Sequence, residues 1–165
     1  MKVVYFVRHA KSSWEDPSLK DFDRPLNKRG FRDAPFMGKL LHAKGAKPDQ
    51  LISSPAMRAK TTAGFFAEAL EIPKEEIRLV RDIYEAFPEE ILRLINELPN
   101  GLNEVMIFGH NPTMTALANK FSEDLISNIP TCGVFKVVAE VDDWQAFGPQ
   151  TGQLTDYHYP KQYFS

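Results

Sequence analysis

A run of five apolar residues near the start of the chain, Val3 to Val7, constrains the fold more than any other feature of the sequence. The run is continuous, does not alternate with polar residues, and contains three β-branched valines. Such runs are typical of strands covered on both faces, as in the centre of a parallel sheet. The run stops abruptly at Arg8 and His9. We therefore expect a buried central strand with a basic and a titratable residue at its carboxyl end.

The rest of the chain alternates short apolar runs with longer segments of helical periodicity. Further strands are expected at residues 50–53, 77–80, 105–108, 135–141 and 154–159. Helices are expected at residues 28–44, 56–70, 89–98 and 112–121. This alternation predicts an α/β protein with three layers, α/β/α, around a mostly parallel central sheet. We expect residues 1–165 to form a single domain.

Two segments complicate this pattern. Residues 10–26 are polar and contain two prolines, so we expect a long loop, and loops of this length are usually functional or mobile. Pro35 lies inside the expected helix 28–44. A proline inside a helix removes one backbone hydrogen bond, so we expect either a kink or a later helix start.

The chemically distinctive residues follow strands. Arg8 and His9 end the first strand, Arg58 opens the helix after the second, and His110 follows the strand at 105–108. In open α/β sheets, ligands bind beyond the carboxyl ends of the strands, where helix N-termini also attract anions. These four residues are therefore expected to meet at one edge of the sheet.

Such a cluster suits a phosphoryl group, which carries about two negative charges near neutral pH. Arginine forms forked contacts with phosphate oxygens, and a neutral imidazole is a competent nucleophile. No cluster of carboxylates typical of a metal site lies near these motifs, so we expect no metal and no cofactor.

Charge and cysteine content restrict the partners and the compartment. The net charge of −2 gives no general attraction to nucleic acids or anionic membranes. The single cysteine suits a reducing compartment, and the first apolar run is too short for a membrane span or signal peptide. These features favour a cytoplasmic protein with neither nucleic acid nor membrane as partner, and they leave the oligomeric state open.

Three segments carry a family resemblance, at residues 3–10, 53–63 and 106–112: Val-Val-Tyr-Phe-Val-Arg-His-Ala, Ser-Ser-Pro-Ala-Met-Arg-Ala-Lys-Thr-Thr-Ala and Met-Ile-Phe-Gly-His-Asn-Pro. They resemble the histidine phosphatase superfamily, the phosphoglycerate mutase-like group. Arg-His-Ala-Lys-Ser-Ser-Trp and Arg-Pro-Leu-Asn-Lys-Arg-Gly are similar to its small branch, the SixA-type phosphohistidine phosphatases. The resemblance implies a phosphoglycerate mutase-like fold, His9 as nucleophile, and Arg8, Arg58 and His110 as the phosphate pocket.

The resemblance also implies an acid that protonates the leaving group, for which Glu85 is the best match; a solvated loop charge is the other reading. Ser12 matches a serine of the mutase pattern and is a candidate hydrogen-bond donor to phosphate, with a turn serine as the alternative. Ala10 and Glu15 depart from that pattern, which has glycine and asparagine there. A carboxylate at Glu15 would repel a phosphate unless it points away, which weakens the mutase interpretation.

The leading hypothesis is therefore a metal-independent phosphatase that forms a phosphohistidine on His9 and acts on protein phosphohistidine. The enzyme alternative is a small-molecule phosphomonoesterase or mutase of the same superfamily. The alternative of another class is a non-catalytic module that binds phosphate or phosphoproteins. Both His9 and His110 argue against such a module, because a pure binding site needs only the arginines.

Overall fold

The computed structural model describes residues 1–164 and contains one six-stranded sheet with the order β3-β2-β4-β1-β5-β6. The strands are β1 (Lys2–Arg8), β2 (Gln50–Ser53), β3 (Arg78–Leu79), β4 (Glu104–Gly109), β5 (Val134–Ala139) and β6 (Gly152–His158). Strands β1 to β4 run parallel, whereas β5 is antiparallel to both β1 and β6. The expected sheet is thus present, with a parallel part and an antiparallel edge.

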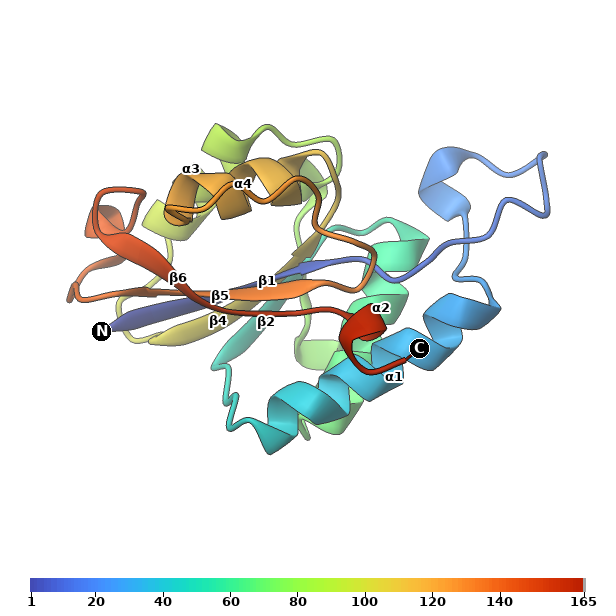
Figure 1. The fold of residues 1–165 in the computed structure, drawn as a ribbon, viewed down its shortest axis with the longest axis horizontal. Coiled ribbons are helices and arrows are strands. Elements are labelled where there is room, and N and C mark those ends of the chain that lie inside the picture. The colour runs from blue at the N-terminus through green and yellow to red at the C-terminus, as the bar shows by residue number, and fades with distance from the viewer. Residues whose placement is uncertain (165) are drawn as a thin grey trace.

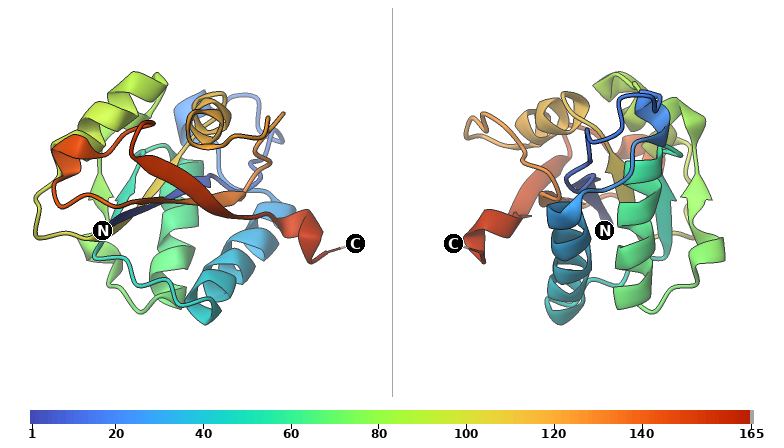
Figure 2. Two further views of the ribbon diagram at one scale, coloured as in Figure 1. Left: turned by 60° about the vertical axis from the view of Figure 1, so that its left-hand side comes forward. Right: turned by 90° about the vertical axis from the view of Figure 1, so that its right-hand side faces the viewer.

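Four α-helices form the two outer layers. They are α1 (Lys28–Ala43), α2 (Met57–Ala69), α3 (Pro88–Asn96) and α4 (Thr113–Phe121). Helices α1 and α2 lie on one face of the sheet, and α3 and α4 lie on the other (Figure 1). The turned views show the same separation (Figure 2). The three-layer α/β/α expectation is confirmed. No helix within residues 1–164 is long and apolar enough to cross a membrane.

Strand β1 is buried on both faces, as its sequence predicts. Val4 and Phe6 pack into the core beneath α3 and α4, while Tyr5 and Val7 pack into the core beneath α1 and α2. This division follows from the two-residue period of a strand. Phe6 also stacks on Phe135 of β5, with ring centroids 4.9 Å apart, an arrangement worth about 0.5–1.5 kcal/mol beyond its buried area.

Most element boundaries differ from the expected ones by one or two residues. Helix α1 begins at Lys28 despite Pro35, because the Asn27 side chain accepts a hydrogen bond from the Gly30 amide and caps the helix. Of the two alternatives, a kink or a later start, the later start is therefore wrong, and Pro35 lies inside the helix. Helix α2 begins at Met57, and in the turn before it the Ser54 hydroxyl accepts a hydrogen bond from the Ala56 amide.

The expected strand at 77–80 is reduced to Arg78 and Leu79, which pair only with β2. Both residues are exposed at the edge of the sheet, where few contacts favour a longer strand. Helix α4 starts at Thr113, and the side chain of Asn111 accepts a hydrogen bond from the Thr115 amide.

Candidate active site

The parallel strands β1, β2 and β4 end level with one another. Arg8 pairs with Gly109 across β1 and β4, and Ser53 pairs with Phe108 across β2 and β4. The residues that follow these strands therefore emerge at one edge of the sheet. His9 and His110 lie there with ring centroids 5.2 Å apart.

His9 is held in one orientation by the backbone. Its Nδ1 lies 2.7 Å from the carbonyl oxygen of Ala10, and a carbonyl can only accept a hydrogen bond. Nδ1 therefore carries the proton and Nε2 carries the free lone pair. Burial is the main cause that lowers the pKa of His9 to about 3; the hydrogen bond with Ala10 opposes this shift, whereas His110, Arg58 and Arg8 act in the same direction as burial. His9 is thus a neutral imidazole with an available nitrogen at neutral pH.

His110 comes from the end of β4 and is also neutral. Its Nε2 lies 2.8 Å from Ser54 Oγ, and the Tyr84 ring packs edge-on against it at 5.5 Å. Burial lowers the pKa of His110 to about 4, and the charge of Arg58 acts in the same direction. Its Nδ1 is buried without a hydrogen-bond partner among residues 1–164. That nitrogen is suited to contact a ligand oxygen.

Arg8 lies at the last position of β1, where it is partly buried. Its Nη1 donates to the carbonyl of Ile129 at 2.9 Å, but its Nε is buried without a partner in the described part of the chain. Burial lowers the pKa of Arg8, and the charge of Arg58 lowers it further, so the two arginines are close enough to repel. An anion placed between them would relieve both effects.

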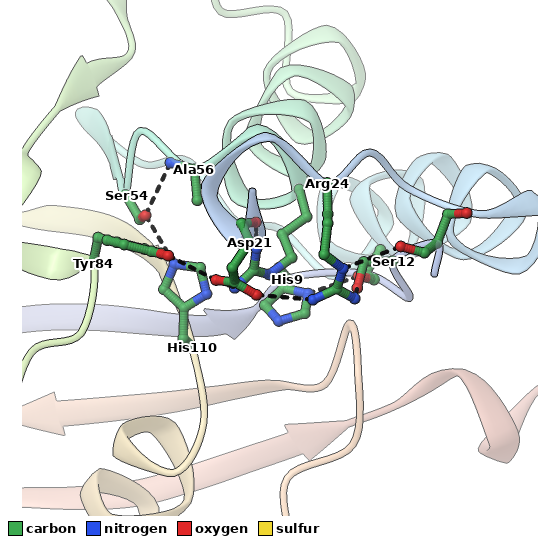
Figure 3. A network of polar contacts seen from close by, with 11 residues as sticks. His9, Ser12, Asp21, Arg24, Ser54, Ala56, Tyr84 and His110 are labelled. Carbon is green, nitrogen blue, oxygen red and sulfur yellow. Dashed lines mark hydrogen bonds and ion pairs between the residues drawn. The ribbon is translucent and has the colours of Figure 1, made fainter. Parts of the chain in front are cut away.

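Arg58, the second residue of α2, already holds a carboxylate. Its Nη1 donates to the backbone carbonyl of Asp21 at 2.6 Å, and its Nη2 contacts Asp21 Oδ2 at 2.9 Å. The Tyr84 hydroxyl donates to the same oxygen at 2.7 Å. Figure 3 shows Asp21 between Tyr84 and Arg24.

The Asp21 carboxylate is kept ionised by this arrangement. Burial alone would raise the pKa of Asp21, but the hydrogen bond from Tyr84 and the charges and hydrogen bonds of Arg58 and Arg24 lower it well below its usual range. Asp21 and Tyr84 were not found by sequence reasoning. Asp21 is one of several acids in the loop 10–26, and nothing in the local pattern indicates which of them folds back onto the pocket.

Arg24 contacts other residues of the loop 10–26. Its guanidinium contacts Asp21 Oδ1 at 3.0 Å, donates to Ser12 Oγ, and stacks 3.3 Å above the exposed ring of Trp14. The Ser12 oxygen expected to meet phosphate therefore accepts a hydrogen bond from Arg24. Its role in substrate binding stays a prediction. Glu15 is exposed and lines neither of the cavities described next.

Two cavities adjoin the cluster. One, of about 370 Å³, is lined by Arg58, His110, Asp21, Tyr84 and Glu85, among others. Glu85 is exposed there and has a positive φ of 62°, a backbone conformation that non-glycine residues rarely adopt. Its assignment as the acid stays a prediction. The second cavity, a cleft of about 620 Å³, includes Arg8 in its wall.

The donor set suits an oxyanion. Within residues 1–164, no group of three or more histidine, cysteine, aspartate or glutamate side chains is arranged to hold a metal ion. Two arginines and two neutral imidazoles with free nitrogen atoms instead converge on one edge of the sheet. Such donors stabilise the negative charge of a phosphoryl group during transfer.

Comparison with known proteins gives consistent results. Residues 4–88 match the family model of the histidine phosphatase superfamily (branch 1). An uncharacterised protein of Mycobacterium tuberculosis is 29% identical over 165 residues, which cover 94% of this chain and 100% of that protein.

Solved structures share the fold. A SixA protein of Agrobacterium tumefaciens, described as a candidate phosphohistidine phosphatase, is 33% identical with a TM-score of 0.80, over 96% of this chain and 98% of that one. The protein histidine phosphatase SixA in complex with tungstate is 18% identical with a TM-score of 0.77, over 97% and 98% of the two chains. At that identity, the second likeness concerns the fold alone.

Proposed function

Because the chain belongs to the histidine phosphatase superfamily, we propose that it is a metal-independent phosphatase that passes a phosphoryl group through His9 to water and acts on protein phosphohistidine. The observation that carries the proposal is the hydrogen bond from His9 Nδ1 to the Ala10 carbonyl, which leaves Nε2 free beside two arginines.

In the first step, Nε2 of His9 attacks the phosphorus of the substrate. A bond forms between Nε2 and phosphorus while the bond between phosphorus and the substrate nitrogen breaks, and its electron pair leaves with the substrate imidazole. That imidazole takes a proton from water. Arg8 and Arg58 hold the phosphoryl oxygens, whose negative charge also favours the protonated form of His110, so that its ring donates a hydrogen bond.

In the second step, water attacks the phosphorylated His9. The Nε2–phosphorus bond breaks, its electron pair returns to the His9 ring, and phosphate leaves with the oxygen of water. The low pKa of His9 makes the neutral ring a good leaving group, because the neighbouring positive charges oppose any further protonation.

Phosphohistidine is the proposed substrate because its leaving group can depart without a strong acid in the site. An imidazole leaves readily once protonated, whereas an alkoxide needs an acid during departure. The exposed Glu85 makes no hydrogen bond with the residues described, so the site is better suited to the easier leaving group. The likeness to the Agrobacterium tumefaciens SixA protein, 33% identical, supports the same choice.

A small phosphomonoester is the second candidate substrate. The pocket of about 370 Å³ beside Arg58 and His110 is large enough for a small organic group, and Glu85 lines it. On such a substrate we propose that Glu85 protonates the departing oxygen. A mutase reaction is less favoured, because Ala10 and Glu15 depart from the mutase pattern, which has glycine and asparagine there.

The test compares turnover of a phosphohistidine-containing protein with turnover of a panel of alkyl and aryl phosphate esters, with and without EDTA. We expect the highest kcat/KM on phosphohistidine and no effect of EDTA. Negligible turnover of phosphohistidine beside efficient turnover of one alkyl ester would replace the first candidate with the second. Loss of activity in EDTA that a divalent ion restores would overturn the metal-independent mechanism.

A further inference from the structure

The cleft of about 620 Å³ beside Arg8 is strongly basic. Five of its side chains are basic and one is acidic: Arg8, Lys11, Arg29, Arg32, Lys161 and Asp33. The chain as a whole carries a net charge of −2. Positive charge is therefore concentrated in this cleft, next to the cluster around His9.

The single carboxylate in the wall offsets only part of this charge. Asp33 is almost fully buried and contacts Arg32 Nη2 at 2.8 Å and Arg29 Nε at 3.7 Å. Both arginine side chains remain 48% exposed. Within residues 1–164, no carboxylate lies within ion-pair distance of Lys11 or Lys161. Four positive charges in excess are thus available to a ligand in the cleft.

The start of α1 points to the same conclusion independently. Lys28 and Arg29 occupy its first turn, which contains no acidic residue. Cations are unfavourable at a helix N-terminus, because the helix dipole is already positive there. An anionic partner near this turn would reverse the penalty. Local departures from the usual charge pattern are expected where a functional site takes precedence over stability.

The other residues of the wall favour a polypeptide ligand. Pro130, Tyr159 and Phe164 give the cleft apolar faces between the basic groups. A volume of about 620 Å³ is much larger than one phosphoryl group and falls in the range of roughly 300–1,000 Å³ typical of sites for larger ligands. A peptide segment presents both acidic side chains and an apolar surface to such a wall.

We propose that this cleft binds acidic side chains that flank the phosphorylated residue of a protein substrate, an inference that rests on the proposed function. Arg8 belongs both to the phosphate cluster and to the cleft. A phosphoryl group at His9 therefore places the adjoining chain of the substrate over Arg29, Arg32 and Lys161. Complementary charge at this position selects the partner and speeds its association.

The test uses two peptides with a central stable triazole analogue of phosphohistidine, one flanked by four glutamates and the other by four glutamines. Binding is measured by calorimetry at low and moderate salt. Because exposed ion pairs contribute little individually but several form together, we expect the glutamate peptide to bind about tenfold more tightly at low salt. Added salt should reduce this preference.

Two variants should weaken the preference, because each lowers the excess positive charge of the cleft. Lys161→Glu reverses a charge with no ion-pair partner, and Arg29→Gln removes a charge while the buried Asp33 keeps its contact of 2.8 Å with Arg32. Lys47→Glu is the matched control, since Lys47 is exposed and precedes β2 at the opposite end of the sheet. Affinity for inorganic phosphate should be the same in all four proteins, which shows that the pocket around His9 is intact.

Equal affinity for the two peptides in the wild-type protein would overturn the inference, as would a preference that is unchanged in both variants. Tight binding of a small bisphosphate, together with equal affinity for the two peptides, would assign the cleft to a small-molecule substrate instead. The proposed function is tested separately, by measuring turnover of a phosphohistidine-containing protein. A peptide preference without turnover would support the cleft and contradict the hydrolase, and turnover without a preference would do the reverse.

Discussion

Arg8 and Arg58 belong to the same cluster but line different cavities, and their surroundings differ in charge. Arg58 contacts the ionised Asp21 through two hydrogen bonds, and the cavity beside it also contains Glu85. Arg8 has one carbonyl partner, a buried Nε without any, and a cleft of basic side chains beside it.

This difference shows that the two arginines would bind a phosphoryl group in different ways. Arg8 is fixed in place with a donor to spare, so an incoming oxyanion satisfies a group that is already desolvated. Arg58 must share its guanidinium with Asp21 or release it. The side of the site with Arg8 is therefore ready to bind an anion. On the side with Arg58, the carboxylate of Asp21 competes with the anion for the guanidinium.

The largest expected effect comes from removing His9, the proposed nucleophile. His9→Ala should eliminate detectable turnover, because no other described imidazole at this edge has one ring nitrogen held by a backbone carbonyl and the other free. Phosphate binding should persist in part, since both arginines remain. Steady-state kinetics and phosphate titration check this, and substantial turnover by the variant would contradict the role of His9 as nucleophile.

Replacing either arginine tests the comparison directly. Arg8→Ala and Arg58→Ala should each lower kcat/KM by about 10²–10³-fold, the loss typical of one electrostatic donor. Affinity for inorganic phosphate should fall more for Arg8→Ala, because Arg58 binds phosphate only against competition from Asp21. Lys60→Ala, an exposed position on the same helix as Arg58, is the control. Equal losses of affinity would show that the Asp21 contact is without energetic consequence.

The buried imidazoles should make the protein sensitive to acid. The pKa of His9 is about 3 in the folded protein and about 6.5 when unfolded, so below pH 6.5 the unfolded state binds the additional proton. The free energy of unfolding should then fall as the pH drops from 7, by about 3 kcal/mol at pH 4 from this residue. Urea unfolding of the wild type and His9→Asn checks this, and parallel pH curves would contradict it.

The variant Glu85→Gln tests the role of the carboxylate in the cavity beside Arg58. Because Glu85 is exposed and water competes with it as a proton donor, an alkyl phosphate ester should be slowed about tenfold, below the 10²–10⁴ of a fully engaged acid. Phosphohistidine should change by no more than about twofold, since its leaving group needs less help. A uniform loss on both substrates would indicate that Glu85 acts in the attack of water. No loss on either would show a surface charge.

The smallest effect is expected from Asp21→Asn. Removing its charge should increase the affinity for phosphate by up to about fivefold, in keeping with the small energies of exposed ion pairs. Asp23→Asn is the matched control, because Asp23 is exposed on the same 3₁₀ turn and forms no ion pair within residues 1–164. Weaker phosphate binding by Asp21→Asn would mean that Asp21 positions Arg58 and does not compete with phosphate.

The sequence by itself determined the layers, the strands, of which only β3 is much shorter than expected, and the position of the chemical groups after β1, β2 and β4. These features are encoded locally. A continuous apolar run specifies a buried strand, and parallel strands in register place whatever follows them at one edge. The presence of Arg8, His9, Arg58 and His110 at this edge therefore needed no knowledge of side-chain packing.

Only the tertiary structure decided what surrounds those groups. The contact of Asp21 with Arg58 joins positions 37 residues apart, and the basic cleft joins α1 to the end of the chain. The same packing buried both imidazoles, whereas the contact that holds the proton of His9 on Nδ1 is a local one with the neighbouring Ala10. Sequence patterns report the period of burial along one element. They carry no information on which loop side chain meets which arginine, because that depends on how separate elements pack.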